Sequence, residues 1–447
     1  MLLVRRCRLL VLSLSQEIAG MYALADCNNF FVSCERVFNP SLNGRAVVVL
    51  SGNDGCVIAR SNEAKALGIP MGCPAFQIKD HTDPRGVVQL SARHIVYRDM
   101  SQRVMMILGG EFNKIEVYSV DEAFFKLPDE DEEKLRLRLA SLVDKIYRYV
   151  GIPVSIGFAP TRTLAKLAAE KAKKDPTNTE RVKGLVQQND IEESLSNTSI
   201  DDVWGVGRKL TKALRQRGVF NAWQLVQFPT SLLRSLFSIT MVRTQAELRG
   251  IDSVSINPVD IAHKSIMNSR TFGHVIKSQR EIADAVLNFA AHCAKQLRDE
   301  HSLARSVTVY VRGDHFREDL PFYSNSCQVR LETPTSGTPE IVSAALQAFH
   351  SIFREGFYYR KAGVMVSDIV DAGHVQLDVF AEQHASKTRK LMVAVDHINN
   401  ALGKKAVTLV PQQLGKGEWK PTQSHTARQS ATLHIHTGMS PIRKEKS

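Results

Sequence analysis

Met21-Tyr-Ala-Leu-Ala-Asp26 is a short apolar run that ends in a carboxylate. A second apolar run, Val117-Tyr-Ser-Val-Asp-Glu-Ala-Phe-Phe125, carries an Asp-Glu pair in its middle. Short apolar runs of this kind predict buried strands, and carboxylate oxygens are the ligands that hard divalent cations prefer. The sequence therefore predicts a sheet in which Asp26, Asp121 and Glu122 hold a pair of cations for phosphoryl transfer.

The two acidic sites can converge only if the chain turns or bulges at the Asp-Glu pair, because successive side chains of a strand point to opposite faces. The apolar runs 115–120 and 123–127 flank the pair, so we expect a hairpin there, with Asp26 on a neighbouring strand. A lone Asp-Glu pair is more often a solvated turn. The pattern by itself leaves both interpretations open.

Size and charge limit the kind of protein. A chain of 447 residues exceeds one ordinary hydrophobic core, so we expect several domains. Lysine and arginine outnumber aspartate and glutamate by 58 to 46, giving a net charge of +12 and an isoelectric point near 9.3, which favours a polyanionic partner. The seven cysteines form no Cys-x-x-Cys pair, which fits a reducing cytoplasm. No apolar run is long enough to span a membrane.

Strand-like and helix-like segments alternate along the first part of the chain and predict the α+β class. Apolar runs at 46–50 and 154–158 indicate further strands. A helix that starts in the acidic cluster 129–133 is expected to run to about residue 149, and another is expected at 163–174. The sequence pattern changes after residue 185, and a helical region is expected there.

The remaining chain divides into a third folded unit and two ends. The unit begins near His263 and has a βαββαβ-like pattern. Beyond Asp371 the periodicity is lost, which indicates a partly disordered tail or a docking arm. Residues 1–20 are expected to be a poorly ordered extension, with Met1 and Met21 both open as start sites.

Several motifs together carry a family resemblance. They are Met21-Tyr-Ala-Leu-Ala-Asp-Cys-Asn-Asn-Phe-Phe-Val-Ser-Cys-Glu35, Val47-Val-Val-Leu-Ser51, Asn53-Asp-Gly-Cys-Val-Ile-Ala-Arg60, Glu63-Ala-Lys-Ala-Leu-Gly68 and Ser119-Val-Asp-Glu-Ala-Phe124. The chain resembles the Y-family, lesion-bypass DNA polymerases over about residues 21–380. Within that family it is most similar to the UmuC-type catalytic subunits of bacterial DNA polymerase V.

The resemblance implies a right-hand polymerase fold of the α+β class. Its expected parts are a palm (21–40 and 90–184), fingers (41–89), a thumb with a helix-hairpin-helix (185–255), a little finger (256–371) and a basic C-terminal tail (372–447).

The resemblance also implies roles for individual residues at the active site. Two Mg²⁺ ions would be held by Asp26, the carbonyl of Cys27, Asp121 and Glu122. Nucleotide contacts would come from Phe30, Phe31, Asn62, Lys65 and Lys173. The ring of Phe31 would exclude a 2′-hydroxyl, whereas Phe30 could equally be a core aromatic and Lys173 part of a solvated helix face. Asn62 stands where some relatives have a tyrosine.

Two further segments have roles implied by the resemblance. Gly205-Val-Gly207 resembles a helix-hairpin-helix turn, whose glycines let backbone N–H groups reach a DNA phosphate. DNA contacts would come from Gly205, Gly207, Arg208, Lys209, Lys212 and Arg270. The peptide 376–380 resembles a sliding-clamp docking motif through Gln376, Leu377 and Phe380, with Val379 where leucine is more usual.

The expected function is template-directed translesion DNA synthesis in DNA repair, of the error-prone SOS type. The implied partners are a damaged primer-template, deoxynucleoside triphosphates, the sliding clamp, a UmuD-type accessory protein and RecA. Two alternatives stay open. A palm-fold nucleotidyl cyclase would need the acidic sites without the helix-hairpin-helix, and a catalytically inactive DNA-binding scaffold would not need the carboxylates.

Overall fold

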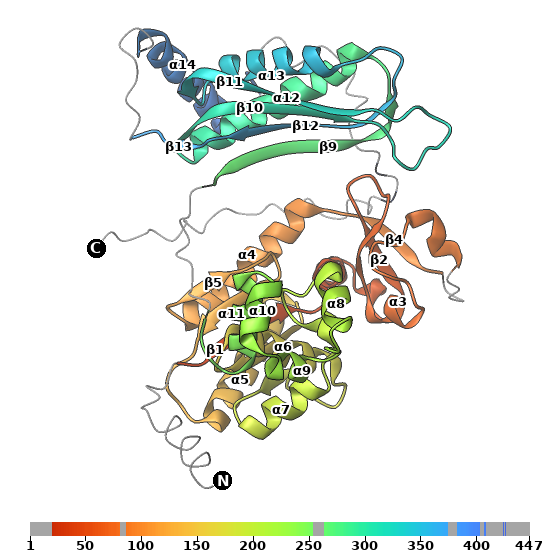
Figure 1. Ribbon diagram of the computed structural model, residues 1–447, viewed down its shortest axis with the longest axis vertical. Helices are drawn as coiled ribbons and strands as arrows, with labels where there is room; N and C mark the ends of the chain where they lie inside the picture. The colour runs from red at the N-terminus through yellow and green to blue at the C-terminus, as the bar shows by residue number, and fades with distance from the viewer. Residues whose placement is uncertain are drawn as a thin grey trace. The chain divides into compact units, whose positions relative to one another are not determined.

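The structure is a computed structural model that describes residues 20–80, 86–253, 263–373, 382–402, 406–407, 423 and 425 (Figure 1). It divides into two compact units, which are described separately. Unit 1 comprises Met1–Leu50 and Cys56–Val259, and unit 2 comprises Ser51–Gly55 and Asp260–Ser447.

Unit 1 is built around a central sheet with the strand order β5-β6-β1-β7-β8. The bounds are β1 (Tyr22–Cys27), β5 (Ile115–Val117), β6 (Glu122–Lys126), β7 (Val154–Ala159) and β8 (Val182–Gly184). β1 lies in the middle and is antiparallel to both β6 and β7. Every residue of β1 and β7 is buried, which explains why these two strands read as continuous apolar runs.

Helices cover both faces of the central sheet. Alternate residues of β1 belong to different apolar clusters: Ala25 shares a cluster with Leu139 of α5 (Glu132–Val150), and Leu24 shares one with Ala165 of α6 (Arg162–Lys174). α2 (Phe30–Phe38) and α4 (His94–Glu111) also contribute to the first cluster. The sheet is therefore the buried layer that fixes where its strands end.

Gly157 on β7 allows α6 to approach the sheet closely. A β-carbon at this position would overlap the backbone of Ala165 and Ala169. Glycine is therefore required here by the packing of α6 and not by its backbone angles. The close approach matters for function because α6 also carries Lys166 and Lys173.

Two smaller parts complete unit 1. A three-stranded sheet has the order β3-β2-β4, with β2 (Val47–Leu50), β3 (Val57–Arg60) and β4 (Val88–Ser91), beside α3 (Asn62–Ala66). A helical region follows β8. Its elements are α7 (Gln188–Ser196), α8 (Arg208–Arg215), α9 (Ala222–Gln227), α10 (Thr230–Leu236) and α11 (Ile239–Leu248), with a 3-10 turn at Ile200–Asp202. Two further 3-10 turns, Pro40–Leu42 and Ala75–Asp80, lie earlier in unit 1.

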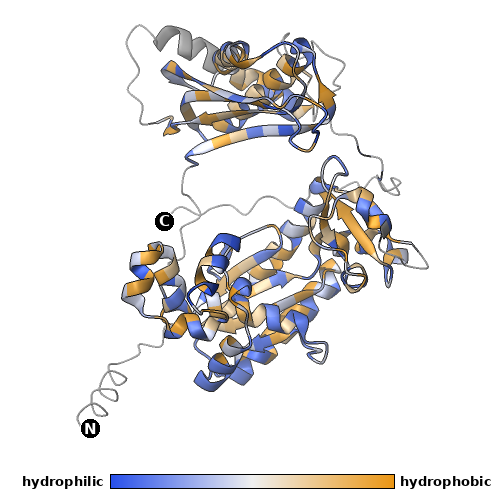
Figure 2. Cartoon of the chain, turned by 45° about the vertical axis from the view of Figure 1, so that its right-hand side comes forward, coloured by the Kyte–Doolittle hydropathy of each residue, from blue (hydrophilic) through white to orange (hydrophobic). Residues whose placement is uncertain are grey.

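Unit 2 contains a second sheet covered by helices. Its elements follow the order β9 (Ser265–Ile276), α12 (Gln279–Asp299), β10 (Ser302–Arg312), β11 (Ser324–Thr335), α13 (Thr338–Ile352) and β12 (Tyr359–Ser367), with the short β13 (Val370–Asp371) paired to β10. This is the βαββαβ order expected from the sequence. Figure 2 shows hydrophobic and hydrophilic residues alternating along these strands, as expected for a sheet with helices on one face.

The C-terminal region, expected to be a partly disordered tail or a docking arm, is helical in part. It contains α14 (Glu382–Ala401), which is held to unit 2 by an ion pair between Asp396 and Arg298 at 2.6 Å. Met392 of the same helix is buried. Residues 1–19 and the peptide 376–380 lie outside the described residues. Among the residues that are described, no helix is long and apolar enough to cross a membrane.

Candidate active site

The two predicted carboxylate sites lie at one end of the central sheet. Asp26 near the end of β1 is the direct register partner of Glu122, the first residue of β6. Asp121 precedes it in the turn of the β5–β6 hairpin, and its carbonyl accepts a hydrogen bond from the N–H of Cys27 at 2.9 Å. The predicted hairpin is therefore present, and it places Asp26 on the neighbouring strand.

Each carboxylate is bound by a different polar partner. Lys173 donates to both oxygens of Asp26, at 2.8 and 3.1 Å. Lys166 pairs with Glu122, and the hydroxyl of Ser119 donates to Asp121. Within the described ranges, no group of three or more His, Cys, Asp or Glu side chains is arranged to hold a metal ion as the side chains stand. The fold thus brings the three residues to one place without joining their oxygens into a single cluster.

The electrostatics of Asp26 favour a bound cation. Burial raises the pKa of Asp26 to about 6 against the opposing effect of Lys173, and the charge of Glu122 raises it further. Burial also raises the pKa of the Cys27 thiol well above its ordinary value, so this thiol is neutral and only the carbonyl of Cys27 is a suitable ligand. Three carboxylates stand against two lysines here, so the hard oxygen donors keep a net negative charge, which fits divalent cations such as Mg²⁺.

Phe31 lies on α2, five residues after Asp26, and its ring is held in place by Tyr97. Its ring stacks on Tyr97 at 4.4 Å between centroids and 16° between planes, and it remains partly exposed. The Tyr97 hydroxyl donates to the buried carboxylate of Glu35 at 2.7 Å, and Arg93 binds the same carboxylate. Phe30 is only 3% exposed and belongs to the apolar cluster, which favours the core interpretation for that ring.

A basic cavity of about 910 Å³ lies beside Asp26 in unit 1. Three of the predicted nucleotide contacts, Asn62, Lys65 and Lys173, line it together. Lys65 donates to the side-chain carbonyl of Asn29 at 2.6 Å, and Asn29 in turn donates to Asn62 at 3.0 Å. Burial, and then the charge of Lys173, lower the pKa of Lys65, and these effects exceed the opposing charges of Glu170 and Asp26.

Sequence reasoning missed several residues of this cavity. Its further basic residues are Arg36, Arg60, Lys174 and Arg181. Arg60 closes one of the motifs quoted above, and that position was the available signal. Arg181 comes from the segment between α6 and β8, and no local pattern marks it.

The glycine turn has the expected local geometry. Gly205 has a φ of +88°, a left-handed conformation that favours glycine. α8 begins at Arg208 directly after Gly207, and Arg208, Lys209 and Lys212 are exposed. Arg270 is an exposed residue of β9 in unit 2. The clamp-like residues Gln376, Leu377 and Phe380 lie outside the described residues.

Comparison with known proteins now gives the family. The model of the impB/mucB/samB family matches residues 25–170, and that of the impB/mucB/samB family C-terminal domain matches residues 263–379. The chain is 38% identical to protein UmuC of Salmonella typhimurium over 427 residues, which cover 93% of this chain and 100% of the relative. The chain belongs to the impB/mucB/samB family.

Other relatives of this family member extend the comparison. It is 27% identical to DNA polymerase IV of Pelotomaculum thermopropionicum over 410 residues, covering 87% of this chain and 95% of the relative. A solved structure of a Y-family DNA polymerase chimera of Dbh and Dpo4 matches with a TM-score of 0.61 at 20% identity, covering 78% of this chain and 99% of that one. The expected Y-family relationship and α+β polymerase fold are confirmed.

Proposed function

We propose that this family member is a template-directed DNA polymerase for translesion synthesis. The observation that carries the proposal is the position of Lys173. Its ammonium group binds Asp26 at 2.8 Å, and the same residue lines the basic cavity. One side chain thus joins the carboxylate end of the sheet to a cavity suited to a triphosphate, as nucleotidyl transfer requires.

The parts of the chain take the roles that the polymerase relatives suggest. The central sheet with α2, α4, α5 and α6 acts as the palm (21–40 and 90–184), and the small sheet with α3 acts as the fingers (41–89). The helices of 185–255 act as the thumb, and residues 256–371, most of which belong to unit 2, act as the little finger. The DNA contacts come from the glycine turn, α8 and Arg270.

The chain's own residues contribute positioning and charge to the reaction. Two Mg²⁺ ions held by Asp26, Asp121, Glu122 and the Cys27 carbonyl would stabilise the attacking and leaving oxygens when bound. Lys65 and Lys173 would balance triphosphate charge, and the ammonium group of Lys173, which binds Asp26 in the structure, would contact the phosphates when a cation neutralises that carboxylate. Phe31, backed by Tyr97, forms the wall against a 2′-hydroxyl.

The bond changes follow from this arrangement. The primer 3′-hydroxyl oxygen forms a bond to the α-phosphorus of the deoxynucleotide and gives up its proton to solvent water. The bond from that phosphorus to the bridging oxygen breaks, and pyrophosphate leaves. The two substrates are held in place before the reaction, which is the main contribution a protein makes to phosphoryl transfer.

The proposed partners are those that the resemblance of the sequence implies. The peptide 376–380 binds the sliding clamp, and a UmuD-type accessory protein and RecA assist synthesis on damaged DNA in the cytoplasm. A nucleotidyl cyclase would leave the glycine turn and the basic α8 without a role. A non-catalytic scaffold would leave unexplained the buried carboxylate at the end of β1.

Primer extension tests the proposed function. The full chain is incubated with Mg²⁺, deoxynucleotides and a primer-template that is either undamaged or contains one lesion, with and without the clamp and accessory proteins. We expect extension past the lesion under the complete conditions. Failure to extend either template with all partners present would contradict the proposal.

A further inference from the structure

Trp204 connects the glycine turn to the turn that carries the carboxylates. It is the residue directly before Gly205, and its indole N–H donates to the hydroxyl of Tyr118 at 3.2 Å. The two rings lie 5.5 Å apart at 89°, and Trp204 is also 5.6 Å from Phe124. Tyr118 opens the β5–β6 turn, and its N–H donates to the carbonyl of Glu122 at 3.0 Å.

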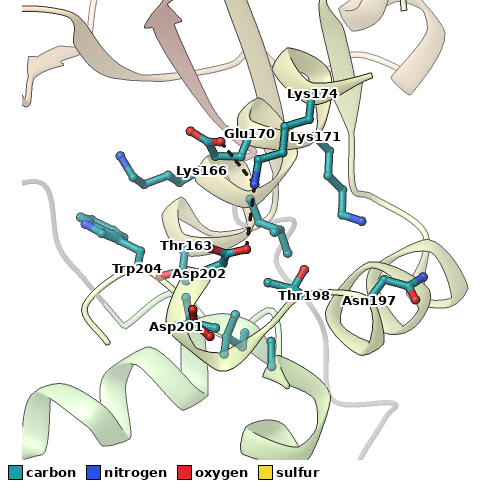
Figure 3. Close-up of a pocket in the computed structure, with 14 residues that line it drawn as sticks. Thr163, Lys166, Glu170, Lys171, Lys174, Asn197, Thr198, Asp201, Asp202 and Trp204 are labelled. Atoms are coloured by element: carbon teal, nitrogen blue, oxygen red, sulfur yellow. Dashed lines mark ion pairs between the residues drawn. The ribbon is translucent and has the colours of Figure 1, made fainter. Parts of the chain in front are cut away.

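Lys166 makes a second connection to the same ring. Its ammonium group pairs with Glu122 and lies 5.5 Å from the centre of the Tyr118 ring and 5.9 Å from that of Trp204. Figure 3 shows Lys166 and Trp204 on the same side of a cavity of about 460 Å³ between α6 and the start of the helical region. A cation over an aromatic face is attracted to it, so the indole helps to fix the partner of Glu122.

These contacts make the indole part of the support of both acidic residues. The hydrogen bond to Tyr118 stabilises the turn that contains Asp121, and the cation–π contact stabilises the position of Lys166, which binds Glu122. The N–H of Val206 already donates to the carbonyl of Val203 at 2.9 Å, so a DNA phosphate would bind the N–H groups of Gly205 and Gly207 and would restrain the adjacent indole. A restrained indole would in turn restrain Tyr118 and Lys166, and through them the positions of Asp121 and Glu122.

We propose that Trp204 is a positioning residue that couples DNA-backbone binding at the glycine turn to the placement of Asp121 and Glu122. This inference rests on the proposed polymerase function and adds a regulation of its active site. The alternative is a purely structural role, in which Trp204 only packs against the apolar cluster where it is partly buried. That alternative changes stability and leaves cation binding unaltered.

The test compares cation affinity with and without the indole. Mn²⁺ binding to the protein–DNA complex is measured by calorimetry, with the heat of binding to DNA alone subtracted, and single-nucleotide extension is measured alongside. Trp204→Ala should weaken Mn²⁺ binding roughly tenfold and lower the extension rate by about the same factor, as expected when reacting groups are misplaced. Because coupling between two ligands is reciprocal, its affinity for the primer-template should weaken by about the same factor when Mn²⁺ is present. Its affinity for the primer-template without Mn²⁺ and its nucleotide KM should change much less.

The matched variants separate coupling from packing. Trp223→Phe alters another tryptophan of the same apolar cluster and should leave Mn²⁺ affinity at the wild-type value. Trp204→Phe and Tyr118→Phe each remove the interresidue hydrogen bond and keep a ring, so the double variant should be no weaker in Mn²⁺ binding than either single one. These two also serve if Trp204→Ala does not fold.

The outcomes distinguish this inference from the proposed function. Wild-type extension, combined with unchanged Mn²⁺ affinity in Trp204→Phe and Tyr118→Phe, would overturn the coupling and leave the polymerase intact. A wild-type protein that binds DNA and Mn²⁺ but extends no primer would overturn the polymerase proposal itself, and the coupling with it.

Discussion

Asp26 and Glu122 lie directly opposite each other across the antiparallel pair of β1 and β6. Side chains of directly opposed residues share a face of a sheet, and like charges in that arrangement are destabilising unless a cation lies between or beside them. Here Lys173 and Lys166 each neutralise one carboxylate. The end of the central sheet is therefore built to receive positive charge.

Phe31→Ala should admit ribonucleotides. The ring is held by stacking on Tyr97, so removing it opens the space that a 2′-hydroxyl would need. We expect the preference for deoxynucleotides over ribonucleotides to fall roughly 100-fold, the size of discrimination that exclusion of one hydroxyl provides. Steady-state extension with each nucleotide gives the ratio. Tyr97→Phe, which keeps the supporting ring, is the control, and an unchanged ratio in Phe31→Ala would make Phe31 merely structural.

Lys65→Ala should raise the KM for the incoming nucleotide. Its ammonium group lines the basic cavity, and loss of a hydrogen bond to a charged group costs about 1.5 kcal/mol or more, which is roughly tenfold in affinity. Single-nucleotide kinetics measure the effect. Lys79→Ala removes an exposed lysine outside the cavity and should change the KM little. Equal KM values for the two variants would exclude Lys65 from triphosphate binding.

Gly157→Ala should destabilise unit 1 and lower activity together. The added methyl group would push α6 away from β7, and overpacking of this kind costs about 1–3 kcal/mol. Urea unfolding and primer extension measure the two effects. Gly109→Ala provides the opposite case, because its β-carbon meets nothing within 4 Å and alanine favours a helix. A Gly157→Ala protein as stable as wild type would contradict the close approach of α6.

The chain's strands were easier to predict than its cavity. β1 occupies the predicted residues because burial on both faces leaves an unbroken apolar run. β5 ends earlier than predicted, at Val117, because the N–H groups of Tyr118 and Ser119 turn back to the carbonyl of Glu122. Helix α4 was missed because a buried serine, Ser101, and a glycine pair near its end blur its apolar stripe.

At the site, too, residues marked by a local sequence pattern were predicted, and residues brought together only by tertiary folding were missed. The carboxylates were found because each closes or interrupts a recognisable strand. The pairing of Lys166 with Glu122 was missed, because it depends on how close α6 comes to the sheet. Arg181 was missed because only tertiary folding brings it to the cavity that Lys65 lines.

The clamp peptide calls for substitutions and not for truncation. Removing everything beyond Asp371 would also remove α14, whose Asp396 is paired with Arg298 of unit 2. Replacing Leu377 and Phe380 together by alanine should abolish stimulation by the sliding clamp and leave basal extension at the wild-type level. Extension assays with and without the clamp measure this, and stimulation that survives the double substitution would locate the clamp contact elsewhere.

The central claim is that the carboxylates at one end of the central sheet hold the cations for DNA synthesis. Single-nucleotide primer extension over a range of Mg²⁺ concentrations tests it, with wild type compared to Asp121→Asn and Glu122→Gln. Each substitution keeps the side-chain shape and removes one ligand charge, so we predict a rate loss on the order of 1,000-fold or more at saturating nucleotide. Extension by both variants at the wild-type rate and Mg²⁺ requirement would contradict the account.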